Sequence, residues 1–420
     1  MREVELNDYI KKSQKYQEIL NINDNKKKRL PTLNAKIGEV IKKAVVEVSA
    51  KNVEYSLTTV NLKMEGWRPE SREGHTLTVY RNYGVVMGGH CSAPYSMAQV
   101  FNFDNGQWGK QFPLSSARSY HSSILYKGRF VVVFGGMGSY DVSRKCRLCF
   151  NSINLIDLQT WTSRQLRMTN EENVEARRSH GALLMGKYML IFGGMNTRRQ
   201  HLQDFVYLDL KELRWYEKEY KVEGRELAEQ MQTGLAKHKM IGHFRSTHKN
   251  LPLYSSEYND SEGAYIFGGQ FGNTEENTLL FLGFNKYNPY LKKLEYGGMP
   301  PSSTDPLLER LNDNVIAVIS GEMSDRNIKL FRIKEKEFVG IHKFVNPLFL
   351  GGLGSTLSKY DDHMYLFFGL AETGYVGGVY ALTLNEKVIT NEGRKKKDTT
   401  EEVEWRREKG DIDSESSNSS

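Results

Sequence analysis

Cysteine, proline and long apolar runs are scarce in this sequence, and each scarcity excludes a class of protein. Three cysteines in 420 residues cannot supply the disulfide framework of a small secreted domain. Ten prolines, beside 37 glycines that follow no three-residue period, exclude a collagen-like chain. The longest apolar runs have the length of a strand, far below the ~20 residues that cross a bilayer.

The amino-terminal residues also lack the apolar segment of a secretory signal. We therefore expect a soluble cytoplasmic protein. Two short basic runs, at 25–30 and 393–397, leave a nuclear location open. The net charge of +7 comes largely from residues 1–51, and the core of the chain is only mildly basic, so we do not expect nucleic acid as a partner. The lack of a long apolar run also argues against a membrane partner.

Four segments of the sequence repeat one plan. Each has an arginine, two residues, a histidine, an apolar strand, a turn, a second apolar strand and a pair of glycines. The histidines of this plan are His75, His121, His180 and His248. The glycines are Gly88, Gly89, Gly135, Gly136, Gly193, Gly194, Gly268 and Gly269.

A third strand follows each of the first three glycine pairs and is soon followed by a tryptophan: Trp108, Trp161 or Trp215. Two weaker copies come later, in which Gly321 and Gly369 hold the place of the second glycine. The spacing between these glycines runs from 47 to 75 residues. A repeat of this size indicates an architecture built from stacked repeating units.

This pattern resembles the kelch repeat, over about residues 55–390. The resemblance implies an all-β fold, a six-bladed kelch-type β-propeller with four antiparallel strands per blade. It also implies that the histidines and arginines hydrogen-bond within or between blades, that the glycines allow close backbone approach, and that the tryptophans fill the space between blades. A metal site on these histidines is not expected, because one per blade spreads them around the ring.

The resemblance divides the chain into three parts. We expect a basic, partly helical extension at 1–52, the propeller at 53–390 and a charged disordered tail at 391–420. A strand at 57–67 should pair with the strand at 379–384 and close the ring. The sequence leaves two possibilities open: six blades, or six blades and a partial seventh.

Loop lengths indicate where binding would occur. The long segments follow the glycine pairs or connect one blade to the next, and in a four-stranded antiparallel blade both lie at the same end. Long loops on a rigid scaffold commonly carry binding sites. The candidate partner-binding residues on this rim are His90, Tyr95, Tyr140, Arg144, Arg147, Arg198, Arg199, His201 and Phe271.

Arginine and tyrosine are favoured anchors at protein interfaces. The arginines of the second and third loops predict a partner segment with carboxylates or phosphates, which guanidinium groups bind in a bidentate manner. The segment 221–244 has helical spacing of apolar residues and predicts a short helix across the rim.

The two cysteines of "CRLC", Cys146 and Cys149, do not make a zinc site, which needs four ligands. They also lack the βαβ context of a redox motif. No cofactor fingerprint or nucleophile motif is present in the sequence, so we expect no cofactor, no metal and no catalytic residue.

The function that we expect is a protein-binding scaffold or adaptor. The alternatives that the resemblance implies are a kelch-fold enzyme such as a sugar-acid isomerase, and a ubiquitin-ligase substrate adaptor. An enzyme would need carboxylates near the axis, which Glu275, Glu276, Glu322 and Asp325 could supply. The expected partner is another protein, and cytoskeletal and ubiquitin-ligase components are the classes that the family suggests.

Overall fold

A computed structural model describes residues 53–64, 66–245, 258, 260, 262–275, 277–284, 289–301, 304–321, 328–345, 353–371, 374–375 and 377–388. The expected extension at 1–52 and the expected tail at 391–420 lie outside these residues. The described residues are almost entirely β-strand, with one α-helix, α3 (Arg225–Met231), and one 3-10 helix, η4 (Glu171–Asn173). None of the described helices is long and apolar enough to cross a membrane.

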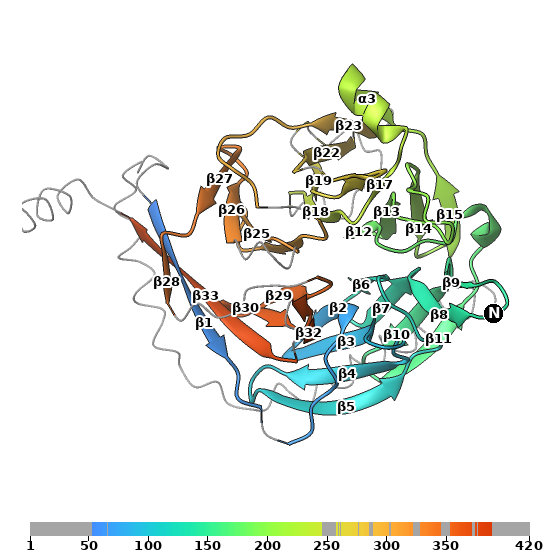
Figure 1. Ribbon diagram of the computed structural model, residues 1–420, viewed down its shortest axis with the longest axis horizontal. Coiled ribbons are helices and arrows are strands. Elements are labelled where there is room, and N and C mark those ends of the chain that lie inside the picture. Colours follow the sequence, from blue (N-terminus) through green and yellow to red (C-terminus); the bar gives the residue numbers. More distant parts are fainter. Residues whose placement is uncertain are drawn as a thin grey trace, which may run out of the picture.

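Six larger sheets follow one another in chain order around a common centre in the described part of the chain (Figure 1). Sheet 1 contains β2 (Glu73–Tyr80), β3 (Tyr83–His90), β4 (Met97–Asn102) and β5 (Gln107–Pro113). Sheet 2 contains β6 (Ser122–Tyr126), β7 (Phe130–Phe134), β10 (Ile153–Asp157) and β11 (Thr162–Leu166). Sheet 3 contains β12 (Gly181–Met185), β13 (Tyr188–Phe192), β14 (Phe205–Asp209) and β15 (Arg214–Glu217).

The later sheets keep this antiparallel plan with additions. Sheet 4 contains β18 (Lys239–His243), β19 (Gly263–Phe267), β22 (Leu279–Phe284), β23 (Pro289–Lys293) and a parallel edge strand, β16 (Lys221–Glu223). Sheet 5 contains β24 (Leu307–Arg310), β25 (Val315–Ile319), β26 (Ile328–Arg332) and β27 (Glu337–Gly340). Sheet 6 contains β29 (Thr356–Tyr360), β30 (His363–Phe367), β33 (Val379–Val388), β1 (Val53–Asn61) and β28 (Lys343–Val345).

The expected pairing of the two ends of the domain is confirmed. Strand β1 runs antiparallel to β33 over its whole length, from Val53 opposite Val388 to Asn61 opposite Tyr380. Its other edge pairs in parallel with β28, which the sequence did not indicate. The apolar residues of β1 alternate, and Tyr55 and Leu57 are buried in the core of sheets 5 and 6.

The fourth repeat differs from the expectation. Its first strand is β18, which follows His238, and His248 lies outside the described residues. The long insertion therefore falls between β18 and β19 and starts near Phe244. The segment 221–244 contains the expected short helix, α3, but it also contains β16 and this first strand.

The repeated residues build a joint between each sheet and the next. The Nε2 atom of His121 lies 2.9 Å from the hydroxyl of Thr76 in sheet 1, and His180 lies 2.8 Å from Ser122 in sheet 2. His238 accepts the backbone N–H of Gly181, at 3.1 Å. His75 lies 2.7 Å from Thr356, which links sheet 6 to sheet 1.

Glycine is required in this joint. The N–H of Gly89 donates to the carbonyl of Arg118 in the next sheet, at 2.9 Å. Gly88 has a φ of 59°, and a Cβ atom there would lie 2.3 Å from the same carbonyl oxygen. The Arg118 guanidinium in turn donates to the carbonyl of Gly135 in its own sheet, at 2.8 Å. Equivalent contacts occur at Gly136 and Gly194.

The three tryptophans pack against the preceding sheet, as expected. Trp108 contacts Phe367 and Phe368 of sheet 6, with ring centroids 5.9 and 5.6 Å apart. Trp215 lies 4.9 Å from Phe134 of sheet 2 and is 2% exposed. Trp161 packs on the aromatic residues of sheet 1. The core thus consists mainly of apolar layers between neighbouring sheets.

Candidate functional site: a rim of short hairpins

Short hairpins follow the glycine pairs and lie at one end of the sheets. The best formed of them joins β8 (Met137–Asp141) to β9 (Cys146–Cys149). After the second strand of sheet 4, β20 (Gln270–Phe271) pairs with β21 (Thr274–Glu275) and with β17 (Leu235–Ala236) in a small separate sheet. After β30 of sheet 6, β31 (Leu370–Ala371) pairs with β32 (Gly374–Tyr375), also as a separate sheet. We call these hairpins, with the turns at 90–94 and 195–201, the hairpin rim.

The backbone just before each first strand holds the hairpin rim in place. Ser119 and Met137 exchange two backbone hydrogen bonds, of 3.0 and 2.7 Å. Arg178 and Met195 do the same at 2.9 Å, as do Leu353 and Leu370 at 3.0 Å. The expected convergence of the two sets of loops at one end is therefore present. It arises because the connection that leads into a sheet pairs with the segment that follows the second strand of the same sheet.

A chain of backbone hydrogen bonds surrounds the centre of the molecule. It passes through the residue directly before each histidine of the joints, and through the matching residues before the first strands of sheets 5 and 6. The N–O distances are 2.6 to 2.9 Å. The members are Gly354, Gly74, Tyr120, Ser179, Lys237 and Asp305, and the amide of each after Gly354 donates to the carbonyl of the one before. All six have positive φ, between 51° and 65°. We call this set the axial ring.

Below the axial ring is a small polar cavity of about 200 Å³. The first strands of the sheets line it, together with the histidines of three joints. Burial lowers the pKa of His121 to about 3, so its imidazole is neutral at physiological pH. Lys239 forms an ion pair with Asp305 at 2.8 Å, so these two charges partly neutralise each other.

Charged side chains gather around Glu73, the residue directly before the cavity-lining Gly74, and we call this place the mouth of the cavity. Glu73 is 7% exposed, and burial raises the pKa of its carboxyl group, while the Tyr120 hydroxyl hydrogen-bonds to it and opposes the shift. His90 Nδ1 lies 3.6 Å from Glu73 Oε1. Burial and the nearby charge of Arg147 lower the pKa of His90. The mouth therefore combines a carboxyl group, a neutral imidazole and a guanidinium group.

Arg198 and Arg199 are exposed at the tip of the third loop, as the sequence predicted. Asn196, which is 6% exposed, holds this tip: its side-chain oxygen accepts the N–H groups of Arg198 and Gln200, at 2.9 and 3.0 Å. Arg199 has a φ of 63°, so the turn is tight. The two guanidinium groups are thus presented on a fixed backbone.

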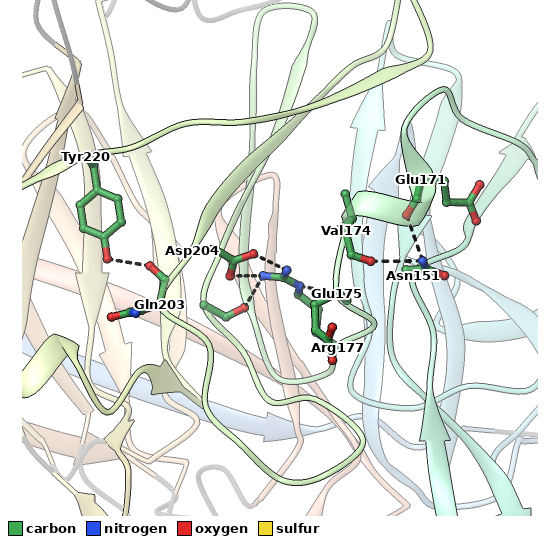
Figure 2. A network of polar contacts seen from close by, with 9 residues as sticks. Asn151, Glu171, Val174, Glu175, Arg177, Gln203, Asp204 and Tyr220 are labelled. Carbon is green, nitrogen blue, oxygen red and sulfur yellow. Dashed lines mark hydrogen bonds and ion pairs between the residues drawn. The ribbon is translucent and has the colours of Figure 1, made fainter.

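Figure 2 shows how the far end of the same loop is fixed. The Arg177 guanidinium forms a bidentate ion pair with Asp204, at 2.7 and 2.5 Å, and also donates to the Gly193 carbonyl. In the same view, Tyr220 donates to the carbonyl of Gln203, at 2.6 Å. Because Arg177 is fully buried, this pair ties the third loop to the joint beneath it.

The second loop also presents expected residues. Tyr140 is 55% exposed on β8, and Arg144 is exposed in the turn that follows. Asp141 accepts backbone N–H groups of Ser143 and Arg144 and so fixes this turn. Arg147 on β9 and His201 at the end of the third loop are half-buried.

Two predicted residues are placed differently. Phe271 is 4% exposed and packs in the core of sheet 4, so its assignment to the binding surface was wrong. It occupies a two-residue strand whose side chain points inward, which the sequence alone did not indicate. Tyr95 lies on the rim, but it donates to Glu70 at 2.5 Å and stacks against the Arg72 guanidinium at 4.0 Å.

Sequence reasoning missed the charged residues that come one or two positions before the histidine in three repeats. They are Glu73, Arg178 and Lys237, and the charge of Arg178 acts on Tyr120, which lines the cavity. Their signal was available, because these positions vary in chemistry from repeat to repeat where the histidine does not. Among the acids proposed for an enzyme, Glu275 is exposed on β21, and Glu276, Glu322 and Asp325 lie outside the described residues.

The cysteines form no disulfide: Cys91 and Cys146 are half-buried and Cys149 is buried. Burial raises the pKa of the Cys149 thiol, which makes it less reactive. Within the described ranges, no group of three or more His, Cys, Asp or Glu side chains is arranged to hold a metal ion.

Three comparisons place the chain among known proteins. Residues 55–243 match the family model described as the KLHDC2/KLHL20/DRC7 Kelch-repeats domain. Two relatives from Arabidopsis thaliana are similar: acyl-CoA-binding domain-containing protein 4, 27% identical over 54% of this chain, and protein 5, 26% identical over 52%. These matches cover 30% of the relatives' own length. A solved structure, "Structure of YjhT", matches 76% of this chain and 98% of that one, with a TM-score of 0.54 and 12% identity.

Proposed function

We propose that this chain, which is a member of the kelch-repeat family, is a non-enzymatic scaffold that binds an acidic segment of a partner protein on its hairpin rim. The observation that carries the proposal is the pair Arg198 and Arg199. Their loop is fixed at both ends, and neither guanidinium forms an ion pair with another described residue. Guanidinium groups held in this way lose little conformational freedom when they bind a carboxylate or phosphate.

The scaffold in this proposal is a six-bladed β-propeller. The described first strands support it, because β2, β6, β12, β18, β24 and β29 contact one another in this order, and β29 contacts β2. The pairing of β1 with β33 supports the same architecture, since it places the two ends of the domain in one sheet. A closed ring of this kind gives the hairpins a rigid base.

The rim favours a protein segment because of its chemistry. It offers an exposed tyrosine, Tyr140, beside the exposed arginines of two neighbouring loops, and these are residue types enriched at binding hot spots. We expect a cytoplasmic partner of the cytoskeletal or ubiquitin-ligase class, as the family suggests.

The test is selection from a displayed library of random peptides on the immobilised protein. We expect peptides rich in Asp and Glu to be enriched by the wild-type protein and lost with the double variant Arg198→Glu, Arg199→Glu. The matched control is Lys127→Glu, Lys211→Glu, which reverses two exposed charges in turns at the opposite end of sheets 2 and 3. If the rim variant selects the same peptides as the control, the proposal is wrong.

A kelch-fold enzyme, such as a sugar-acid isomerase, is the second candidate. It is favoured by one observation, the carboxyl group of Glu73 beside Tyr120 at the mouth of the axial cavity. Incubating the purified protein with sugar acids and following anomer exchange by NMR tests it. Turnover that is lost in Glu73→Gln would establish the enzyme and overturn the scaffold.

A further inference from the structure

The mouth of the axial cavity contains polar atoms that have no partner. Glu73 begins β2 and lies directly opposite His90, the last residue of β3, so the two side chains share one face. Arg147 lies on β9, in the hairpin that follows the second strand of sheet 2, and its charge acts on His90. The charges of Glu73 and Arg147 also act on the hydroxyl group of Tyr375, on β32.

Four atoms in this cluster are buried and unpaired among the described residues: Glu73 Oε2, His90 Nδ1, His90 Nε2 and Arg147 Nη1. Buried polar atoms in folded proteins almost always have a hydrogen-bond partner. Neither neighbouring tyrosine supplies one to Glu73 Oε2: the Tyr375 hydroxyl donates to the Cys91 carbonyl at 3.1 Å, and the Tyr120 hydroxyl, which acts on the Glu73 carboxyl group, leaves Oε2 unpaired. Two side chains on facing strands of sheet 1, and a third from β9 whose charge acts on His90, therefore carry unpaired buried groups in one neighbourhood.

The opposite charges of Glu73 and Arg147 determine which kind of ligand group can bind between them. A cation would be attracted by Glu73 but repelled by Arg147, and an anion would meet the reverse. A neutral group with both donors and an acceptor can pair with each of the three side chains. Glu73 Oε2 and a His90 nitrogen accept, and Arg147 Nη1 donates.

We propose that Glu73, His90 and Arg147 form a subsite for a primary carboxamide, the side chain of an asparagine or glutamine in the bound partner segment. This inference rests on the proposed function, because it concerns the same segment. A primary carboxamide has two N–H donors for the two acceptors and a carbonyl oxygen for the guanidinium. A main-chain amide has a single N–H and would leave one acceptor unpaired.

Peptide selection followed by a double-mutant cycle tests the subsite. Peptides are selected on the wild-type protein, and the tightest one is remade with its Asn or Gln changed to Ala, Asp or Lys. On the wild type we expect each change to weaken binding by about tenfold or more, as for hydrogen bonds to charged groups. On Glu73→Leu and on Arg147→Met the Asn-to-Ala change should have almost no effect.

Two variants from different sheets keep the test valid if one of them is destabilised, and thermal unfolding checks both. The matched control is Glu275→Leu, which removes an exposed carboxylate from the rim of sheet 4 and should keep the full tenfold effect. Selected peptides with acidic residues but no fixed Asn or Gln would overturn the subsite and leave the proposed function standing. A fixed Asp or Lys that depends on Glu73 would also overturn it. Failure to enrich any peptide would overturn both.

Discussion

At the scale of the residue, the joint between neighbouring sheets depends on main-chain atoms more than on side chains. The carbonyl that accepts from Gly194 belongs to Leu235, whereas the equivalent carbonyls in the two earlier joints belong to arginines. Any residue can supply this carbonyl, so the arginine is dispensable there. The glycine is not dispensable, because a side chain would occupy the space of the carbonyl oxygen.

Substitution of Gly88 tests this difference. Its φ is 59°, and an added Cβ would meet a backbone oxygen at 2.3 Å. We expect Gly88→Ala to lower the free energy of unfolding by about 3 kcal/mol or more, measured by urea denaturation. Gly128 is the matched control, since it has the same φ of 59° and no heavy atom within 4 Å of the added Cβ.

For Gly128→Ala we expect a loss of about 1 kcal/mol, the cost of the left-handed backbone alone. Equal losses in the two variants would show that the joint tolerates a side chain and that only the backbone conformation matters.

At the scale of the element, sequence reasoning succeeded where a strand carried its own markers. The first three repeats have arginine, histidine, two glycines and tryptophan in order, and sheets 1 to 3 form where they indicate. The first strand of the fourth repeat was predicted in the wrong place, because Arg245 and His248 have the spacing of the repeat's arginine and histidine. They come after the first strand, which has already ended at His243. The true marker, His238, was hidden because Leu235 stands where the arginine was sought.

The hairpin rim could be predicted only in part, for a similar reason. Exposure of Arg198 and Arg199 follows from a polar loop between two strands. The burial of Phe271 depends on a three-stranded pairing with β17, a contact between segments far apart in the sequence. The cluster at the mouth brings Glu73 and Arg147 together from different sheets, and no local pattern contains that information.

Strand β1 offers a prediction at this scale, because a single strand joins the amino-terminal end of the described chain to its last sheet. Leu57 is fully buried in the core between sheets 5 and 6. We expect Leu57→Ala to reduce the free energy of unfolding by about 2–5 kcal/mol. Val60 of the same strand is 47% exposed, and Val60→Ala should change the free energy of unfolding by less than about 0.5 kcal/mol.

Chemical denaturation followed by tryptophan fluorescence measures both variants. A Leu57→Ala protein as stable as the wild type would mean that β1 adds little to sheet 6.

At the scale of the whole molecule, the contact between His75 and Thr356 joins the last sheet to the first. An equivalent contact between His121 and Thr76 joins sheets 1 and 2. The first joins residues 281 apart in the chain and the second joins residues 45 apart. If the sheets form a closed ring in solution, the two contacts have the same surroundings and should contribute equally.

We expect Thr356→Val and Thr76→Val each to lower the free energy of unfolding by about 1 kcal/mol, the value of one buried hydrogen bond. The shift of the urea midpoint measures this loss. An open array of sheets would leave His75 hydrated, and Thr356→Val would then cost nothing while Thr76→Val kept its effect. The comparison of the two variants therefore tests closure directly.

The axial ring has a consequence for how such a protein can change. Its hydrogen bonds use only amide and carbonyl groups, and its members include glycine, serine, tyrosine, lysine and aspartate. The backbone therefore sets the geometry of the opening, and the identity of each side chain sets its chemistry. One fold of this kind can acquire a new ligand preference by exchanging a few residues around the opening, and a protein engineer could use the same positions to reprogram it.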